Sequence, residues 1–526
     1  MGKRGVSASA GLAWVVFATA KVLATMQGTW RVSVDSSGAQ GNSYSSRSSI
    51  SGDGRFVSFY SPASNLVPGD TNFSVDVFVH DRRSGTTTRV SVDSSGTQGN
   101  DSSYLSSISG NGRCVALVSF ASNLVPGDTN NHPDVFVHDI ETGTTMRASV
   151  DSSGAQSNDC SSAPTISPDG RFVAFHSDAT NLVPGDTNEQ PDVFVHDRLT
   201  SMTTRVSVHS SGAEGNGDSY KPAISVDGRF VSFQSGSSNL VPDDTNGWGD
   251  VFVHDRQSGT TLRVSLDSAG TQANSVSGIP SISGDGRLVA FESFASNLVP
   301  DDTNGLQDVL VRDLETGATT RVSVGSSGAQ GNGFSHFPSI CGDGRFVAFW
   351  SEASNLVPGD TNVAWDVLVH DLATGTTTRA SVDSSGTEGN RYSIEPAISG
   401  DGRFVTFYGA STNLVPGDTN GWEDGFVHGP FLTLEARPEI VTTGSTITLT
   451  TWTGQAGGPV LLAAVELNGS SLFLPITSTR FDASGLWTLY GTVPPGLSGN
   501  VVTFVTLGIA PTGDVEISNL EPVTFR

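Results

Sequence analysis

Short apolar runs separated by turn residues recur along most of this 526-residue chain. In the first copy of the pattern the runs cover residues 30–34, 48–51, 55–60 and 76–81. They are rich in Val, Ile, Phe and Thr and are bounded by Gly, Asp, Asn and Pro, which is typical of short β-strands and not of helices. The pattern therefore predicts four strands in each copy.

The copies follow one another at a constant interval of 58 residues. In the runs 55–60 and 76–81, apolar residues occur on both sides of the strand alternation, so both faces of each predicted sheet must be covered. Seven four-stranded sheets that each need two neighbours predict an all-β fold, a seven-bladed β-propeller over residues 29–429. One arginine marks the same position in every copy: Arg31, Arg89, Arg147, Arg205, Arg263, Arg321 and Arg379.

The two ends of the repeat complement each other. The first copy opens with a strand that has no preceding blade, and the seventh copy departs from the pattern after His428. We expect the N-terminal strand to become the outer strand of the last blade, because this would pair two edges that are otherwise open to aggregation. The alternative is an open solenoid with capped ends.

The segments outside the repeat have a different character. Residues 1–24 contain Lys3 and Arg4 and an apolar run, 6–20, that is shorter than a membrane span; they indicate a signal peptide or another N-terminal targeting segment. Residues 430–526 carry alternating runs such as 445–452 and 501–505, which predict a C-terminal, Ig-like β-sandwich.

The composition restricts the partners. The chain has 53 acidic and 28 basic residues, a net charge of −25. We expect no nucleic-acid partner, because phosphate binding needs clustered Lys and Arg. Cys114, Cys160 and Cys341 are an odd number of widely separated cysteines, and their spacing gives neither a disulfide framework nor a metal motif.

Some polar residues are repeated in nearly every blade, which indicates a structural role. A histidine fills one strand position in six blades, with Arg312 in the fifth, and we interpret it as a hydrogen-bonding residue between blades, since six copies of a catalytic base are implausible. The Asp53-Gly54-Arg55 sequence and its repeats predict a tight hairpin turn. The histidines are His80, His138, His196, His254, His370 and His428.

The repeat resembles a known family. Residues 166–175 (Ile-Ser-Pro-Asp-Gly-Arg-Phe-Val-Ala-Phe), followed by 192–197 (Asp-Val-Phe-Val-His-Asp), are similar to the repeat of TolB-type, WD-repeat-like β-propellers. The resemblance covers about residues 29–429. It implies an extracytoplasmic, bacterial propeller that binds proteins.

One repeated acidic pattern has two interpretations. Aspartate and asparagine at short spacing offer oxygen ligands to a hard cation such as Ca²⁺. Asp-Thr-Asn after Pro-Gly is also ordinary turn chemistry, in which the side chains bind the local backbone, and we favour this second interpretation. Apart from calcium we expect no cofactor. The residues concerned are Asp70, Asn72, Asp76, Asp128, Asn130, Asp134, Asp186, Asn188, Asp192, Asp244, Asn246, Asp250, Asp302, Asn304, Asp308, Asp360, Asn362, Asp366, Asp418, Asn420 and Asp424.

Residues that differ between copies gather in two loops of each blade, one before the innermost strand and one after Asp-Thr-Asn. In an up-and-down blade both loops emerge on the same face, so we expect a variable rim around the channel mouth that binds a protein or a glycan. The alternative is unconstrained drift. The rim residues are Arg47, Phe73, Tyr104, His132, Tyr220, Lys221, Trp248, His336, Phe337, Trp365, Tyr392, Glu395 and Trp422.

The sequence favours a secreted, periplasmic or cell-surface binding or scaffold protein without enzymatic activity. We assign no catalytic residue, because no nucleophile elbow, metalloprotease motif or phosphate loop is present. The first alternative is a propeller glycan hydrolase or lyase, although the innermost-strand entry positions supply one acidic residue where glycoside hydrolysis needs two. The second alternative is a calcium-stabilised adhesin at the cell surface.

Overall fold

The computed structural model describes residues 27–431 and, beyond them, the backbone of seven strands between residues 435 and 524. The two regions belong to separate compact units. The predicted targeting segment, 1–24, lies outside the described residues. Among the residues described, no helix is long and apolar enough to cross a membrane.

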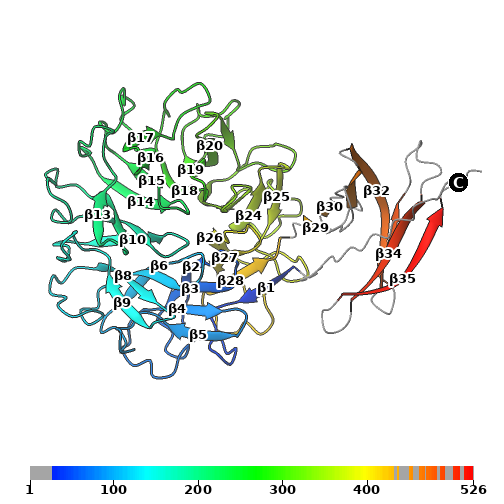
Figure 1. Ribbon diagram of the computed structural model, residues 1–526, viewed down its shortest axis with the longest axis horizontal. Helices are drawn as coiled ribbons and strands as arrows, with labels where there is room; N and C mark the ends of the chain where they lie inside the picture. Colours follow the sequence, from blue (N-terminus) through cyan, green and yellow to red (C-terminus); the bar gives the residue numbers. More distant parts are fainter. Residues whose placement is uncertain are drawn as a thin grey trace, which may run out of the picture. The chain divides into compact units, whose positions relative to one another are not determined.

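Residues 27–431 form a ring of seven four-stranded antiparallel sheets, as the sequence predicts (Figure 1). The innermost strands surround the axis, and the next strand of each blade pairs with its outer side. The innermost strands are β2 (Ser46–Ile50), β6 (Ser103–Ile108), β10 (Ser161–Ile166), β14 (Ser219–Ile224), β18 (Ser277–Ile282), β22 (Ser335–Ile340) and β26 (Ser393–Ile398). The second strands are β3 (Phe56–Ser61), β7 (Cys114–Ser119), β11 (Phe172–Ser177), β15 (Phe230–Ser235), β19 (Leu288–Ser293), β23 (Phe346–Ser351) and β27 (Val405–Gly409).

Two further strands complete each blade. The third strands are β4 (Asp76–Asp81), β8 (Asp134–Asp139), β12 (Asp192–Asp197), β16 (Asp250–Asp255), β20 (Asp308–Asp313), β24 (Asp366–Asp371) and β28 (Asp424–Gly429). The outer strands are β5 (Thr86–Arg89), β9 (Thr144–Arg147), β13 (Met202–Arg205), β17 (Thr260–Arg263), β21 (Thr319–Arg321), β25 (Thr376–Arg379) and, in the seventh blade, β1 (Gly28–Arg31).

The N-terminal strand closes the ring as predicted. β1 pairs antiparallel with β28, with Thr29 opposite His428 and Trp30 opposite Val427. Arg31 reinforces the closure, because its guanidinium lies 3.1 Å from Asp418 and 3.2 Å from Asp424, and both carboxylates are almost fully buried. The seventh blade is therefore assembled from both ends of the repeat region.

The core lies between the blades. Val57, Phe59, Val77 and Phe78 have no exposed surface, and the Phe59 and Phe78 rings stack with centroids 5.8 Å apart. Val77 also packs in one cluster with Ile108 of the next blade. Apolar side chains thus cover both faces of each sheet, which explains why the strands are not apolar on one side only.

The Asp-Gly-Arg hairpins hold neighbouring blades together, in agreement with the turn interpretation. Gly54 has φ of +73°, and a Cβ there would lie 2.2 Å from the ring of Phe404 in the adjacent blade, so only glycine fits. Arg55 extends from the turn and binds both carboxylate oxygens of Asp81, at 2.9 and 2.7 Å. The turn is therefore a packing and bracing element.

The repeated histidines bind hydroxyl groups, as predicted, but the bond lies within one blade and the threonine makes the contact between blades. His80 Nδ1 lies 2.9 Å from Thr87 Oγ1, and Thr87 donates its one hydroxyl proton to the Val34 carbonyl of the preceding blade at 2.5 Å. The imidazole must therefore be the donor in the first bond. The other five histidines contact the matching threonine in the same way, and Arg312 does so in the fifth blade.

The C-terminal unit contains seven strands that pair antiparallel in chain order as one sheet. The predicted Ig-like sandwich stays a prediction, because the connections between these strands and their side chains lie outside the described residues. The strands are β29 (Glu435–Ala436), β30 (Leu449–Thr453), β31 (Leu461–Leu467), β32 (Ser470–Phe481), β33 (Leu486–Gly491), β34 (Val501–Ile509) and β35 (Val515–Thr524).

Removing the buried guanidinium at the ring closure will destabilise the propeller. We expect Arg31→Met to lower the free energy of unfolding by about 3–5 kcal/mol, because it leaves buried carboxylates without their cation. Urea unfolding followed by tryptophan fluorescence measures this change. Arg55→Met is the matched control: its side chain is 39% exposed, so a much smaller loss is expected. Equal losses of unfolding free energy in the two variants would show that the Arg31 ion pairs stabilise the propeller no more than an exposed ion pair does.

The buried histidines will make the propeller sensitive to acid. Burial lowers the pKa of His254 to about 4, so the folded protein keeps this ring neutral where the unfolded chain protonates it. Its contribution is therefore complete above pH 6.5 and is lost as the pH falls toward 4. Between pH 6.5 and pH 4 this histidine should cost the parent about 3 kcal/mol of folding free energy. We expect the His254→Gln variant not to show that part of the acid loss.

Urea midpoints at neutral pH and at pH 4 compare the variant with the parent. Buried carboxylates such as Asp424, whose pKa burial raises to about 6, act in the opposite direction. Both proteins share them, so they cancel in the difference. The same acid loss in both proteins would contradict the assignment.

Candidate binding surface on the loop face

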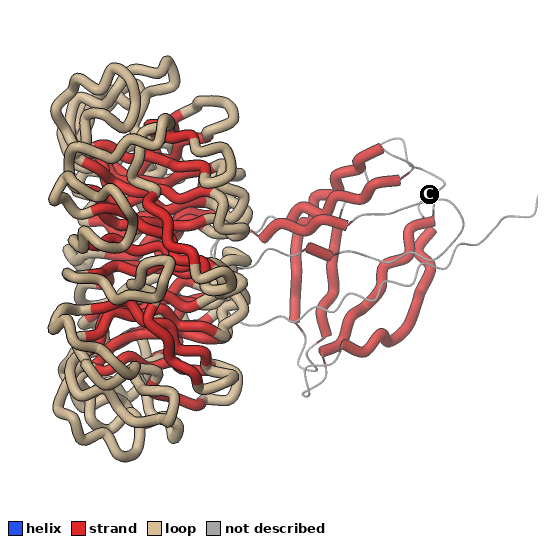
Figure 2. Tube along the Cα trace, turned by 60° about the vertical axis from the view of Figure 1, so that its left-hand side comes forward, coloured by secondary structure: helices blue, strands red, loops and turns tan. Residues whose placement is uncertain are grey.

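Two long loops of every blade emerge on one face of the ring, which we call the loop face. In the first copy they are residues 62–75, between β3 and β4, and residues 90–102, between β5 and β6. Figure 2 shows the strands as the middle layer of the propeller with loops on either side. The Asn100 amide donates to Asn123 Oδ1 at 2.9 Å, so the loop before an innermost strand contacts the loop after the second strand.

A buried arginine organises these loops at the positions considered for calcium. The Arg89 guanidinium lies 3.2 Å from Asp70 and 3.0 Å from Asp76. Asn72 Nδ2 donates to Asp76 and to the Gly99 carbonyl, at 3.1 and 3.0 Å. The equivalent arginine makes the corresponding two ion pairs in the other blades. These aspartates are therefore ion-paired with an arginine in every blade, and the calcium interpretation stays a prediction.

Each innermost strand bulges where it reaches the loop face. The pairing with the second strand shifts register there, for example between Ser46 and Ser49 in the first blade. In all seven blades one non-glycine residue of the bulge adopts φ between 46° and 53°, a conformation that costs energy and re-aims the side chain. These residues are Arg47, Leu105, Ala163, Lys221, Ile279, Phe337 and Glu395.

Charged side chains from four blades gather near the axis at this level; we call Arg47, Lys221, Glu292 and Glu395 the axial cluster. Arg47 Nε lies 2.9 Å from Glu395 Oε2, joining the first and seventh blades. The pKa of Lys221, from the fourth blade, responds to Arg47, Glu395 and Glu292. Glu292, from the fifth blade, accepts a hydrogen bond from the Phe337 amide at 2.9 Å.

Burial dominates the electrostatics of this cluster. It raises the pKa of Glu395, while Arg47 and Lys221 oppose the change. It lowers the pKa of Lys221, and Arg47 adds to that effect. It also lowers the pKa of His176 to about 4, with Lys221 contributing, so His176 is neutral at neutral pH. The cluster therefore combines two basic and two acidic side chains, and burial opposes the charged forms of Lys221 and Glu395.

A continuous aromatic stack flanks the cluster; we call His336, Trp350, Trp365 and Tyr392 the aromatic wall. Ring centroids lie 4.3 Å apart for His336 and Trp350, 5.1 Å for Trp350 and Trp365, and 5.9 Å for Trp365 and Tyr392. Trp365 is 40% exposed, whereas Trp350 is buried and its indole Nε1 has no hydrogen-bond partner within the described residues. The wall thus offers the exposed ring of Trp365, which is backed by the buried ring of Trp350.

The structure brings most of the predicted rim residues together and separates four of them. Phe73, Trp248 and Trp422 are 99%, 51% and 50% exposed and lie in the loops after Asp-Thr-Asn, while His132 lies at the junction of the second and third blades. The residues that belong to or contact the axial cluster and the aromatic wall are Arg47, Lys221, His336, Phe337, Trp365, Tyr392 and Glu395. Tyr104 and Tyr220 instead contact the second-strand residues Tyr60 and His176.

The sequence analysis missed the second-strand contribution to this surface. Tyr60, His176, Glu292, Trp350 and Tyr408 all occupy one position, near the loop-face end of the second strand. Six different residue types occupy that position in the seven blades, and only tyrosine occurs twice. The position three residues earlier is valine in all seven copies. Applying the comparison of repeated and variable residues to strands as well as loops would have found them.

Comparisons with known proteins bear on the fold. No family model and no curated protein matches the chain. Among solved structures, it is similar to a putative TolB from Agrobacterium tumefaciens, with 14% identity, a TM-score of 0.36, and coverage of 66% of this chain and 95% of that one. It is also similar to an oligogalacturonate lyase in complex with manganese, with 13% identity, a TM-score of 0.44, and coverage of 77% and 94%.

A third similar structure is an acylaminoacyl peptidase from Pyrococcus horikoshii, at 8% identity and a TM-score of 0.44, covering 81% of this chain and 58% of that one. The predicted seven-bladed propeller is confirmed by the seven four-stranded sheets of the described residues 27–431. At these identities the similarity assigns no activity.

Because a guanidinium lies between the loop aspartates, calcium will not stabilise the propeller through them. We expect millimolar Ca²⁺, added to chelator-treated protein, to leave the melting temperature unchanged, since a ligand that binds only the folded state would raise it. Differential scanning calorimetry measures this. A rise that Asp70→Asn reduces would contradict the expectation and restore the calcium interpretation.

Proposed function

We propose that this protein is an extracytoplasmic binding protein whose loop face, centred on the axial cluster and the aromatic wall, takes a peptide segment of a partner protein. The observation that carries the proposal is the convergence of ionic groups from four blades beside a partly exposed aromatic stack. Tryptophan, tyrosine and arginine at the centre of a partly desolvated surface are the residues that dominate protein interfaces.

The balance of charges supports a peptide. Arg47 and Lys221 face Glu292 and Glu395, so the cluster complements a segment that carries both signs or that offers amide donors and acceptors. The partly exposed ring of Trp365 adds an aromatic surface for such a segment. The overall charge of −25 favours partners with basic surfaces.

Hydrolysis of a glycan is less well supported, although the structure adds a second carboxylate to the one expected from the sequence. Glu395 is ion-paired with Arg47, and Glu292 already accepts the Phe337 amide hydrogen. Neither carboxylate is available as the unengaged acid or nucleophile that a glycosidase pair requires.

Selection of a random peptide display library against the full chain tests the proposal. We expect enriched peptides to bind the parent and to bind Trp365→Ala at least about tenfold more weakly, because truncating a central aromatic anchor commonly costs more than 1.4 kcal/mol. Fluorescence polarisation with labelled peptides measures both affinities. Phe73→Ala is the matched control, since Phe73 is an aromatic residue of a loop on the same face, outside the wall, and its loss should leave binding unchanged.

Peptides that bind the parent and Trp365→Ala equally would contradict the proposal. A glycan array screened in parallel gives the competing result: release of sugar that Glu395→Gln abolishes would replace the binding function with hydrolysis.

A further inference from the structure

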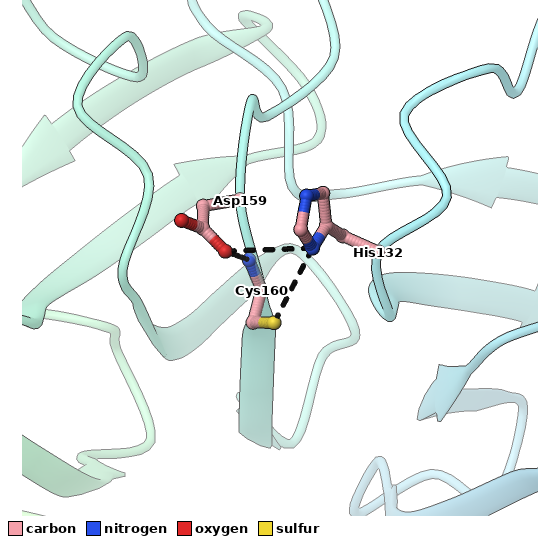
Figure 3. Close-up of side chains that lie close together, drawn as sticks. All are labelled: His132, Asp159 and Cys160. Atoms are coloured by element: carbon pink, nitrogen blue, oxygen red, sulfur yellow. Dashed lines mark hydrogen bonds and ion pairs between the residues drawn. The ribbon is translucent and has the colours of Figure 1, made fainter.

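A second group of side chains lies away from the axis, at the junction of the second and third blades. His132 comes from the loop between β7 and β8, and Asp159 and Cys160 directly precede β10. Figure 3 shows the three side chains directed toward one another. His132 Nδ1 lies 3.6 Å from Cys160 Sγ and 3.4 Å from Asp159 Oδ1, and the three ligand atoms lie within 4.8 Å of one another.

These separations match the edges of a zinc coordination shell. Zinc is bound at about 2.0–2.1 Å by histidine nitrogen, about 2.0–2.2 Å by carboxylate oxygen and about 2.3 Å by thiolate sulfur. In a tetrahedron those bond lengths place nitrogen and sulfur about 3.5 Å apart and nitrogen and oxygen about 3.4 Å apart. Two of the three distances between ligand atoms therefore already correspond to a zinc site, and the third, between Asp159 and Cys160, is within 4.8 Å.

The backbone holds the three residues in place across the blade junction. The Ser161 amide donates to the Pro133 carbonyl at 2.9 Å, which ties the histidine loop to the strand that follows the cysteine. The Cys160 amide donates to Asp159 Oδ1 at 2.8 Å, and the His132 amide donates to Asn130 Oδ1 at 3.2 Å. The arrangement is preorganised, so binding would cost little conformational entropy.

The surroundings favour a cation. Asp178 lies close enough to Asp159 for the charge of Asp159 to raise its pKa, in addition to burial. The His132 and Asp159 side chains are 39% and 48% exposed, which leaves access from solvent for the ion and room for water as a fourth ligand.

The repeat itself shows that the fold does not require these residues. The other six junctions have the same backbone but different side chains, so the combination of histidine, aspartate and cysteine is particular to one junction. The equivalent residues, in the same order, are Ser74/Asp101/Ser102, Gln190/Gly217/Asp218, Trp248/Ser275/Val276, Leu306/Gly333/Phe334, Ala364/Arg391/Tyr392 and Trp422/Ser43/Tyr44.

The geometry points to a zinc site formed by His132 Nδ1, Asp159 and the Cys160 thiolate, with a fourth position open to solvent or to a group of a bound partner. Nitrogen and sulfur ligands select zinc over calcium and magnesium. On binding, the thiol loses its proton to solvent and the sulfur forms a bond to the metal. The site lies on the loop face, but it shares no residue with the axial cluster and does not depend on the proposed binding function.

A cysteine–histidine nucleophile is a poorer description of the same residues. Burial and the hydrogen bond to Asp159 raise the pKa of the Cys160 thiol to about 11, so the thiolate is scarce in the absence of a metal. A nucleophilic cysteine needs the opposite environment.

Metal titration of the full chain, stripped with a chelator, tests the site. We expect isothermal titration calorimetry to show one equivalent of Zn²⁺ and Co²⁺ to give the absorption band of a cobalt–thiolate bond. Cys160→Ser should abolish that band and weaken Zn²⁺ binding at least about tenfold, since even residues that only support metal ligands contribute that much. Serine occupies the same position in the second copy, at Ser102, so the fold should tolerate the change.

Cys341→Ser is the matched control. Cys341 is buried away from the cluster, and the other six copies carry serine at its position, so metal binding and the cobalt spectrum should be unchanged. Absence of stoichiometric Zn²⁺ binding, or binding that Cys160→Ser leaves intact, would overturn the proposal.

The neighbouring junction allows the site to be built a second time. It already has Asp101, whose Oδ1 accepts the Ser102 amide hydrogen at 2.7 Å just as Asp159 accepts that of Cys160. We expect the double variant Ser74→His, Ser102→Cys to bind two equivalents of Zn²⁺. A correctly folded double variant that still binds one would show that these three residue types on this backbone do not suffice, which would count against the site.

Discussion

The pairing of β1 with β28 is the constraint on which the rest of the propeller depends. Each blade has apolar side chains on both faces, so each needs a neighbour on either side, and only a closed ring provides fourteen covered faces for seven sheets. The closure joins segments from opposite ends of the repeat region and adds the ion pairs of Arg31 with Asp418 and Asp424. Without it, two strand edges and two apolar faces would be open to water.

A second set of repeated interactions fixes the loops in the same arrangement in every blade. The buried arginine of each outer strand binds two loop aspartates, and each strand histidine, through a threonine, is linked to the carbonyl of the preceding blade. Charges buried in this way add little net stability, because their desolvation offsets their attraction, but they specify one arrangement of the loops. The loop face is therefore a rigid frame with variable positions.

The variable positions give the face its chemistry. At the axis, the strained bulge residues and the ends of the second strands combine into the axial cluster and the aromatic wall. At the junction of the second and third blades, the same kind of position holds His132, Asp159 and Cys160. Both groups depend on the frame for their geometry, and neither is required by it, since other blades fold with different residues there.

Features that recur in every blade could be predicted from the sequence, because the repeat makes them visible. The 58-residue interval, the strand pattern and the unmatched ends determined the number of blades, their strands and the closure, because each is a local signal repeated seven times or a direct consequence of counting. The hydrogen-bonding role of the histidines and the Asp-Gly-Arg turns were predictable for the same reason, but the histidine bond lies within a blade and not between blades.

Contacts between singular residues carried no such signal. The ion pair of Arg47 with Glu395 joins the first and last blades, and Cys160 meets His132 across 28 positions of chain, so no spacing rule indicates either. Glu292 and Trp350 lie in strands whose neighbouring residues belong to the core. The strand pattern therefore did not indicate that these two side chains contribute to the loop face. Only the closed ring brings such residues within reach of one another, because it sets the angle between blades that share no local sequence.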